Sequence, residues 1–306
     1  MICLHFACAT HPAQKPVSER IRFDSKLIQP YSFDLEKTKP VESPFVAHYQ
    51  NGTNELLFIA AHHISVRESS NLHEHPTIKT IGAVFNSQSP EAAIIEGVPS
   101  GDELSPQWYI EYARKCERRD YRNCSESAYL AYLADQTHIP FMSGEASDLK
   151  IKTGILEEGF AEEDLLGFYV ARMLPQHFRE DKTFGYSDMA MKKAIESDLL
   201  QSRRDLKSDL KFGYNDFIRW LKKNSPGPIR RFAKSANECA PVATGTRLQK
   251  ISFQVDVIRN RTLLKRIEMM FRTHEKVLVI YGSGHFLSLK PALEAVLGKA
   301  NIEKKY

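Results

Sequence analysis

The chain has 306 residues, of which 42% are hydrophobic, and its 42 basic and 38 acidic residues leave a formal net charge of +4. This length can bury a large core, and the near balance of charges argues against a nucleic-acid partner. The sequence has no apolar run of about 18 residues, so it predicts no membrane-spanning helix.

Residues 1–50 are rich in proline, serine and charged residues and show little periodicity. This composition predicts an extended N-terminal lead-in with little chemistry of its own. From residue 51 to 150, short apolar runs alternate with helical patterns, which is typical of the first part of a parallel α/β core. The expected strands are 56–61, 92–96 and 139–143, and the expected helices are 76–87, 105–115 and 125–137.

Residues 151–250 show no strand pattern and predict a charged helical insertion, with helices near 161–178, 188–209 and 213–223. Its basic residues, between Arg203 and Lys234, alternate with acidic ones at helical spacing, which favours a solvated face over an anion-binding surface. The aromatic residues Tyr214, Phe217 and Trp220 are expected to pack down onto the sheet.

Residues 251–306 complete the core, with a long helix at 252–273, a strand at 277–280 and a helix at 287–297. The predicted fold is therefore α/β, with a mostly parallel central sheet flanked by helices and an inserted helical layer. We expect one domain that carries an insertion. The oligomeric state stays open.

The cysteines and the first residues leave the compartment open. The first nine residues are slightly apolar but lack the basic start and the full apolar core of a secretory signal. We expect a soluble chain that is cytoplasmic, or exported if the true start lies upstream. The five cysteines have no zinc-ligand spacing. Cys116 and Cys124 can close a small loop in an oxidising compartment, and free thiols are the alternative.

Four of the predicted strands end in small residues that are followed by histidine or glutamate. The four residues so placed are His63, Glu96, Glu145 and His285. Ligands of open α/β sheets bind beyond the carboxyl ends of the strands. If the four strands are parallel neighbours, these side chains converge although they are far apart in the sequence.

Two imidazoles and two carboxylates suit a divalent transition metal of the Mn, Co or Zn type. Glu96 ends an otherwise apolar run, where burying a carboxylate is costly unless it is paired or coordinated. His63, Glu96 and His285 are the expected ligands. A metal-free site with a histidine as general base is the alternative, because no compact motif such as His-Glu-x-x-His is present.

The order of these segments resembles the TraB/Tiki family, within the group that includes erythromycin-esterase-like and ChaN-like proteins. That family shows a strand ending in Gly-x-x-His, a strand ending in glutamate, a helix with an Arg-Asn pair and a second Gly-x-x-His. The matching segments, within residues 56–298, are Ala60-Ala61-His62-His63, Ile94-Ile95-Glu96, Ile258-Arg259-Asn260-Arg261 and Gly282-Ser283-Gly284-His285. Two positions differ: Ala60 replaces the usual glycine, and Gly144-Glu145-Ala146 replaces the Gly-Asp-Arg of many members.

The residues and the resemblance together predict hydrolysis by a metal-activated water. Glu145 is expected to take the proton of the water and Arg259 to stabilise the oxyanion, with Arg261 as the alternative cation. The Tiki resemblance implies a peptide bond as substrate, whereas the esterase-like relatives imply an ester or another small molecule. The ChaN-like relatives imply a different class of protein, one that binds haem or another ligand without turning it over.

Overall fold

The structure is a computed structural model that describes residues 21–64, 72–97, 103–121, 124–180, 184, 187–233 and 236–304. It contains a six-stranded sheet with the strand order β4-β3-β5-β2-β1-β6. The strands are β1 (Phe45–Asn51), β2 (Asn54–Ala61), β3 (Ala92–Ile95), β4 (Phe141–Ser143), β5 (Lys276–Gly282) and β6 (Asn301–Glu303). The first four in that order are parallel, and β1 is antiparallel to both β2 and β6. The predicted mostly parallel α/β sheet is confirmed.

Strand β1 lies inside the segment that the sequence predicted to be an extended lead-in. It forms a hairpin with β2, in which Phe45 lies opposite Ala60 and Asn51 lies opposite Asn54. The prediction missed β1 because His48 and Gln50 break up its apolar pattern. Those residues are tolerated because β1 lies next to the edge of the sheet, where the short β6 pairs with only its first half.

Both faces of the sheet are covered by helices, which explains why the central strands are apolar throughout. In β2, the side chains of Leu56, Phe58 and Ala60 belong to the core under α10 (Arg247–Met270) and α11 (Ser283–Leu297). The alternate residues, Leu57 and Ile59, belong to the opposite core. That second core is formed with α2 (Pro76–Gln88), α3 (Gln107–Glu117) and α4 (Glu126–Gln136).

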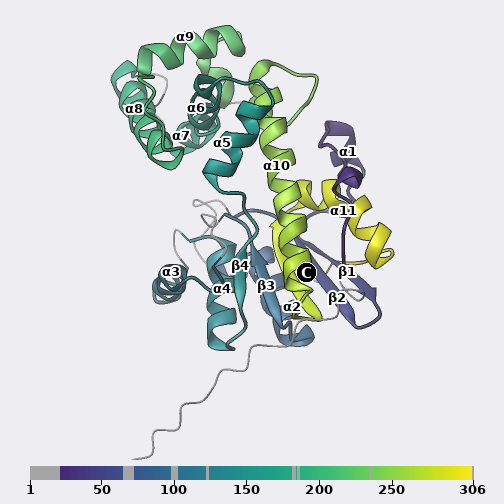
Figure 1. The fold of residues 1–306 in the computed structure, drawn as a ribbon. Helices are drawn as coiled ribbons and strands as arrows, with labels where there is room; N and C mark the ends of the chain where they lie inside the picture. The colour runs from purple at the N-terminus through teal and green to yellow at the C-terminus, as the bar shows by residue number, and fades with distance from the viewer. Residues whose placement is uncertain are drawn as a thin grey trace, which may run out of the picture.

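The helical insertion is a separate layer with its own hydrophobic core (Figure 1). It consists of α5 (Asp148–Glu157), α6 (Glu162–Ala171), α7 (Leu174–Glu180), α8 (Asp188–Asp205) and α9 (Tyr214–Asn224). Phe217 and Trp220 of α9 pack in this core and not on the sheet, which corrects the prediction. Trp220 lies directly on Gly167 of α6, where an added Cβ would come within 2.5 Å of its ring.

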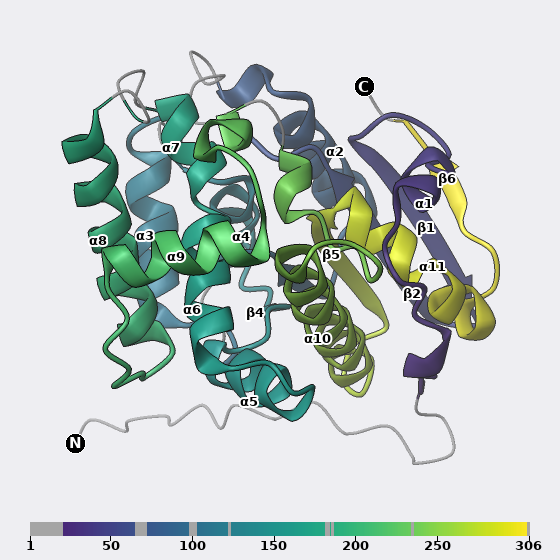
Figure 2. The same cartoon turned by 90° about the horizontal axis from the view of Figure 1, so that it is seen from above.

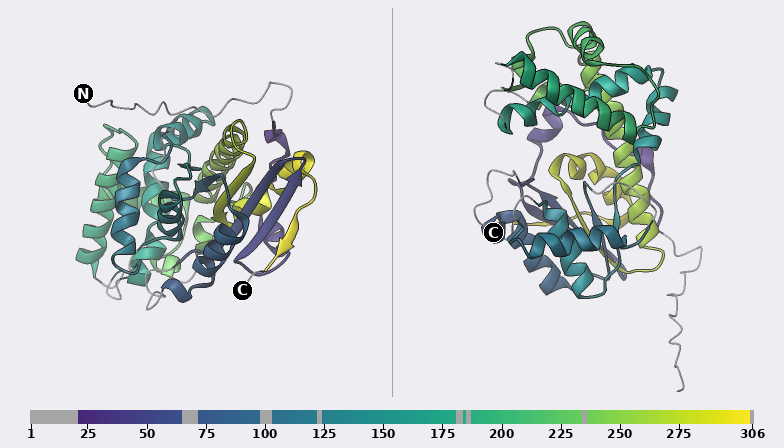
Figure 3. Two further views of the ribbon diagram at one scale, coloured as in Figure 1. Left: turned by 90° about the horizontal axis from the view of Figure 1, so that it is seen from below. Right: turned by 90° about the vertical axis from the view of Figure 1, so that its left-hand side faces the viewer.

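Helix α10 joins the two layers. With 24 residues it extends over roughly 36 Å at the usual rise of an α-helix. Leu248, Ile251 and Val255 belong to the core of the helical layer, whereas Leu263 and Ile267 belong to the core under the sheet. In Figure 3 (right), α10 runs from the upper layer of helices down along the sheet.

Viewed from above, the helices of the insertion lie on the β4 side of the molecule, away from β1 and β6 (Figure 2).

Short elements complete the described chain. They are α1 (Phe33–Lys37), which packs on α11, and the 3-10 helices at Ser25–Leu27, Leu72–Glu74, Ile229–Ala233 and Ala236–Cys239. Within the residues that the structure describes, no helix is both long enough and apolar enough to cross a membrane.

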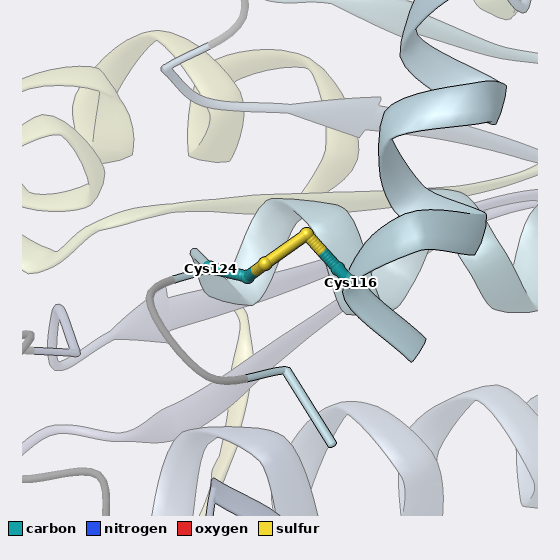
Figure 4. The surroundings of a disulfide bond; sticks show 2 residues. All are labelled: Cys116 and Cys124. Carbon is teal, nitrogen blue, oxygen red and sulfur yellow. A yellow bond between two sulfur atoms is a disulfide. The ribbon is translucent and has the colours of Figure 1, made fainter. Parts of the chain in front are cut away.

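A disulfide bond joins Cys116, in the last turn of α3, to Cys124, just before α4 (Figure 4). Of the two alternatives for these cysteines, pairing is the one that the structure contains. Cys239 is a free thiol. The bond fixes the start of α4, where Glu126 is the first helical residue.

We expect the double variant Cys116→Ala/Cys124→Ala to lose about 2–3 kcal/mol of unfolding free energy. The bond closes a small loop and so lowers the conformational entropy of the unfolded chain. Denaturant unfolding measures this loss, and reduction of the wild-type protein, which keeps both side chains, should produce a similar one. Cys239→Ala is the control for loss of a thiol. A double variant as stable as the wild type would contradict the prediction.

Candidate functional site at the carboxyl edge of the sheet

The four residues predicted at strand ends lie at one edge of the sheet. Glu96 directly follows β3, His63 and Glu145 lie two residues beyond β2 and β4, and His285 lies in the first turn of α11, just after β5. Helix α5, the first of the helical layer, begins only five residues after β4 ends. The site therefore faces the helical layer.

Glu96 is the centre of this group of residues. Its Oε1 accepts a hydrogen bond from Nη2 of Arg259 at 2.9 Å and lies 3.6 Å from Nε2 of His285. Its Oε2 accepts one from the backbone N–H of Gly282 at 2.7 Å and lies 3.6 Å from Nε2 of His63. The two imidazoles thus approach opposite oxygens of one carboxylate.

Gly282 is required for this approach. A Cβ at this position would lie 2.8 Å from Nε2 of His63, closer than side chains tolerate. Since β5 lies between β3 and β2 in the sheet, the last residue of β5 is located between Glu96 and His63. Gly282, which belongs to the motif that ends at His285, therefore leaves room for His63, the histidine that follows β2.

Arg259 of α10 holds the two glutamates together. Its Nε and Nη2 donate to the two oxygens of Glu145 at 2.8 and 2.6 Å, in the forked geometry that favours this ion pair. Burial alone would raise the pKa of Glu145, but the charge and hydrogen bonds of Arg259 outweigh it and lower the pKa to about 2. Glu145 is thus a weak base that fixes Arg259, and the same guanidinium reaches Glu96.

His63 is oriented by a residue that the sequence prediction missed. Its Nδ1 lies 2.6 Å from Oε1 of Glu126, the first residue of α4. This hydrogen bond is the main reason that the pKa of His63 is raised to about 9, against the lowering effect of the partial desolvation of the ring and with a smaller contribution from the charge of Glu96. His63 is therefore an imidazolium at neutral pH. Its side chain is 56% exposed, and that of Glu126 is 7% exposed.

His285 is oriented differently. Its Nδ1 lies 2.7 Å from Oδ1 of Asn260, and Nδ2 of Asn260 donates to Asp256 at 2.8 Å. Because this second bond fixes the amide, Oδ1 can only accept, so Nδ1 of His285 carries a proton. The lone pair of the neutral ring is then on Nε2, the atom that faces Glu96. Burial raises the pKa of Asp256.

A cavity of about 320 Å³ opens beside His285 towards the helical layer. Asp256 and Arg259 of α10 line it from one side, and Tyr31 lines it from the N-terminal segment. The N-terminal segment therefore contributes to the site, although its composition predicted little chemistry there. The part of the wall that comes from the helical layer includes Phe168 and Arg172.

Other residues considered from the sequence lie elsewhere. Arg261 lines two other cavities, one with Lys150 and Lys265 and one with Asp256 and Asn260, whereas Arg259 contacts Glu96 directly. His62 is exposed, its backbone carbonyl accepts a hydrogen bond from Thr77, and its ring stacks on that of His75. Only the second histidine of the pair faces Glu96.

The donor chemistry of the site fits a divalent ion. Both histidines have Nδ1 bound to an oxygen and Nε2 turned towards a carboxylate, which is the arrangement of metal-binding histidines and their supporting partners. The 3.6 Å from each Nε2 to an oxygen of Glu96 is near the separation of two ligands bound to one ion at about 2.0–2.2 Å, although the two histidines approach different oxygens. Among the residues that the structure describes, however, no group of three or more His, Cys, Asp or Glu side chains is arranged to hold a metal.

Comparison with known proteins adds no identification. No protein-family model matches this chain, and the searches of curated proteins and of solved structures also find no match. The function must therefore be argued from the site itself and from the order of its motifs.

Replacing Glu126 by glutamine should lower the pKa of His63 from about 9 towards the ordinary 6.5, because the imidazolium loses its charged hydrogen-bond acceptor. A pH titration of the imidazole signals by NMR measures the change. The stabilisation from this pair is complete below pH 6.5 and is lost as the pH rises through 9. Asp135→Asn, on the same helix, is the control and should leave the pKa of His63 unchanged.

The variant Glu145→Gln should lose about 2–4 kcal/mol of unfolding free energy at neutral pH, because it leaves the largely buried Arg259 with one carboxylate fewer. The pKa of Glu145 is depressed from 4.5 to about 2. Its contribution is therefore present above pH 4.5 and is lost as the pH falls towards 2.

Denaturant unfolding at several pH values tests this sign, with the exposed Glu157→Gln of α5 as the matched control. Equal stabilities of Glu145→Gln and Glu157→Gln at pH 7 would show that the ion pair contributes nothing.

Proposed function

We propose that this protein is a hydrolase of the TraB/Tiki type. The observation that carries the proposal is the pair of histidines on either side of Glu96, each held at Nδ1 and each with Nε2 3.6 Å from a different oxygen of this carboxylate. Hydrolysis needs one group that takes a proton from water and one that gives a proton to the leaving group. Two histidines in different environments can fill these two roles.

His285 is the proton acceptor in this proposal, because the bond of Nδ1 to Asn260 leaves Nε2 as the nitrogen that can accept a proton. His63 is the proton donor, because its bond to Glu126 keeps it protonated at neutral pH. Glu96 stays between them and accepts hydrogen bonds from Arg259 and Gly282, which hold it in one orientation.

Arg259 is proposed to stabilise the oxyanion that forms when water attacks a carbonyl group. The two glutamates engage its Nε and Nη2, so neither occupies Nη1. A guanidinium fixed in this way needs no reorganisation during the reaction, which is the basis of electrostatic stabilisation. Glu145 is given the role of holding this cation, since a pKa of about 2 makes it a poor proton acceptor.

His63, Glu96 and His285 would hold a divalent ion of the Mn, Co or Zn type in a metal-dependent form of the same site. When bound, such an ion supplies a water of near-neutral pKa and polarises the substrate carbonyl. At neutral pH, His63 has to lose its proton before Nε2 can bind the ion, so protons compete with the ion below pH 9.

The order of the motifs supports the choice of substrate. The Tiki resemblance favours a peptide bond, and the esterase-like relatives of that family favour an ester. The cavity beside His285, at about 320 Å³, is at the lower end of the volumes of small-molecule sites. It therefore holds a small molecule or one end of a longer one.

Purified protein should hydrolyse a member of a panel of peptides and esters, and His285→Ala should lower kcat/KM by about 100-fold or more, as for loss of a general base. His62→Ala, which removes an exposed imidazole next to His63, is the matched control and should keep the wild-type rate. Activity of the wild type should fall above pH 9, as His63 loses its proton, and Glu126→Gln should move this limb to lower pH.

Metal analysis and the same assays with and without a chelator separate the two forms of the site. Loss of turnover with chelator, and its return with Mn, Co or Zn, would favour the metal-dependent form. No turnover on any substrate, together with a Soret band on adding haem that His285→Ala abolishes, would refute hydrolysis in favour of ligand binding.

A further inference from the structure

The cavity beside His285 contains one cation that the proposed chemistry does not use. Arg172, the residue after α6, lines the cavity from the helical layer. It makes no ion pair with any carboxylate of the described residues. The other arginine of the same cavity, Arg259, is bound by two carboxylates. The side chain of Arg172 is exposed, so in the free protein its charge is solvated and is paired with no carboxylate of the described residues.

Arg172 is nevertheless held in place. Its guanidinium lies over the ring of Tyr169, 4.6 Å from the centroid. The hydroxyl of Tyr169 donates a hydrogen bond to Asp148 at 2.6 Å, which fixes the ring that supports the guanidinium. Stacking on an aromatic ring orients an arginine without occupying its N–H groups. Those donors remain available to a planar anion such as a carboxylate.

The rest of the wall indicates what the anion is attached to. Phe168, Val255 and Pro241 give the cavity an apolar part, and Asp256 is a carboxyl group in the same space. One unneutralised cation next to a carboxyl group suits a singly charged ligand better than a dianion such as phosphate. Tyr31 also lines the cavity and packs on Gly284, where an added Cβ would lie 3.6 Å from the ring of Tyr31.

We propose that Arg172 binds a free carboxylate of the substrate, and that an apolar group beside this carboxylate fills the cavity. The substrate class is then a peptide cleaved next to its C-terminal residue. In that reaction water adds to the carbonyl carbon, the C–N bond breaks and the leaving nitrogen takes a proton. The products are a peptide one residue shorter, with a new carboxylate, and a free amino acid. This inference rests on the proposed hydrolysis.

Binding of N-acetylphenylalanine and of its amide, measured by calorimetry, tests the carboxylate site through affinity and not through turnover. The acid should bind the wild-type protein at least 10-fold more tightly than the amide, and Arg172→Ala should reduce this ratio to about one. Arg204→Ala, which removes an exposed arginine of α8, is the matched control and should keep the ratio. Arg172→Lys should retain part of it, because the charge remains but the stacked fork is lost.

Equal binding of the acid and the amide by the wild type, absence of binding by both, or an unchanged ratio in Arg172→Ala would each overturn the carboxylate site. Tighter binding of inorganic phosphate than of the acid would overturn the preference for a single charge.

Peptides with a free or an amidated C-terminus separate this inference from the proposed function. Cleavage of both at equal rates would refute the carboxylate site and leave hydrolysis standing. Cleavage of neither, with the binding ratio intact, would refute hydrolysis and leave the carboxylate site standing.

Discussion

The ion pair of Arg259 with Glu96 and Glu145 is the interaction on which the rest of the site depends. Two carboxylates at neighbouring strand ends repel each other, and the side chains of Glu96 and Glu145 are only 12% and 13% exposed. Buried charges of like sign are unfavourable unless an opposite charge lies between them. Arg259 supplies that charge, so the ends of β3 and β4 are stable only while α10 stays in its position on the sheet.

The position of α10 is in turn determined by two hydrophobic cores. Its first half packs among the helices of the insertion, and its second half packs under the sheet. Asp256, Arg259 and Asn260 lie between these halves, at the level of the strand ends. The buried apolar residues on both sides fix the position of these three polar residues relative to the strand ends. His285, Glu96 and Glu145 therefore each contact a residue of α10.

The sequence predicted the part of the site that depends on the sheet alone. His63, Glu96, Glu145 and His285 follow apolar runs, and the carboxyl ends of parallel strands must share an edge, so their convergence needed no further information. Their catalytic or metal-binding roles stay predictions. The four parallel strands of the sheet were also predicted closely, because their apolar runs are strong, whereas β1 and β6 were not predicted.

The residues that the sequence did not predict depend on tertiary packing. Glu126 begins a helix whose start is fixed by packing on α3 and by a disulfide, and nothing in its local pattern relates it to His63. The sequence contains one indication of the role of Asp256. It lies four residues before Asn260, and this spacing places both side chains on the same side of a helix. Tyr31 belongs to the N-terminal segment, which packs on α11, and Arg172 belongs to the helical layer. No local motif of the sequence encodes the approach of either segment to the site.

The sheet layer and the helical layer contribute different groups to the cavity beside His285. The groups that can transfer protons or stabilise an oxyanion come from the strand ends and from the middle of α10. The groups that would contact the remainder of a substrate come from the N-terminal segment and from α6 and its following residues. Since α10 belongs to both cores, a shift of the helical layer displaces Asp256 and Arg259 along with the wall of the cavity. Changes in the packing of α6 against α10 should therefore alter substrate preference and catalytic rate together, whereas changes on the exposed face of α8 should alter neither.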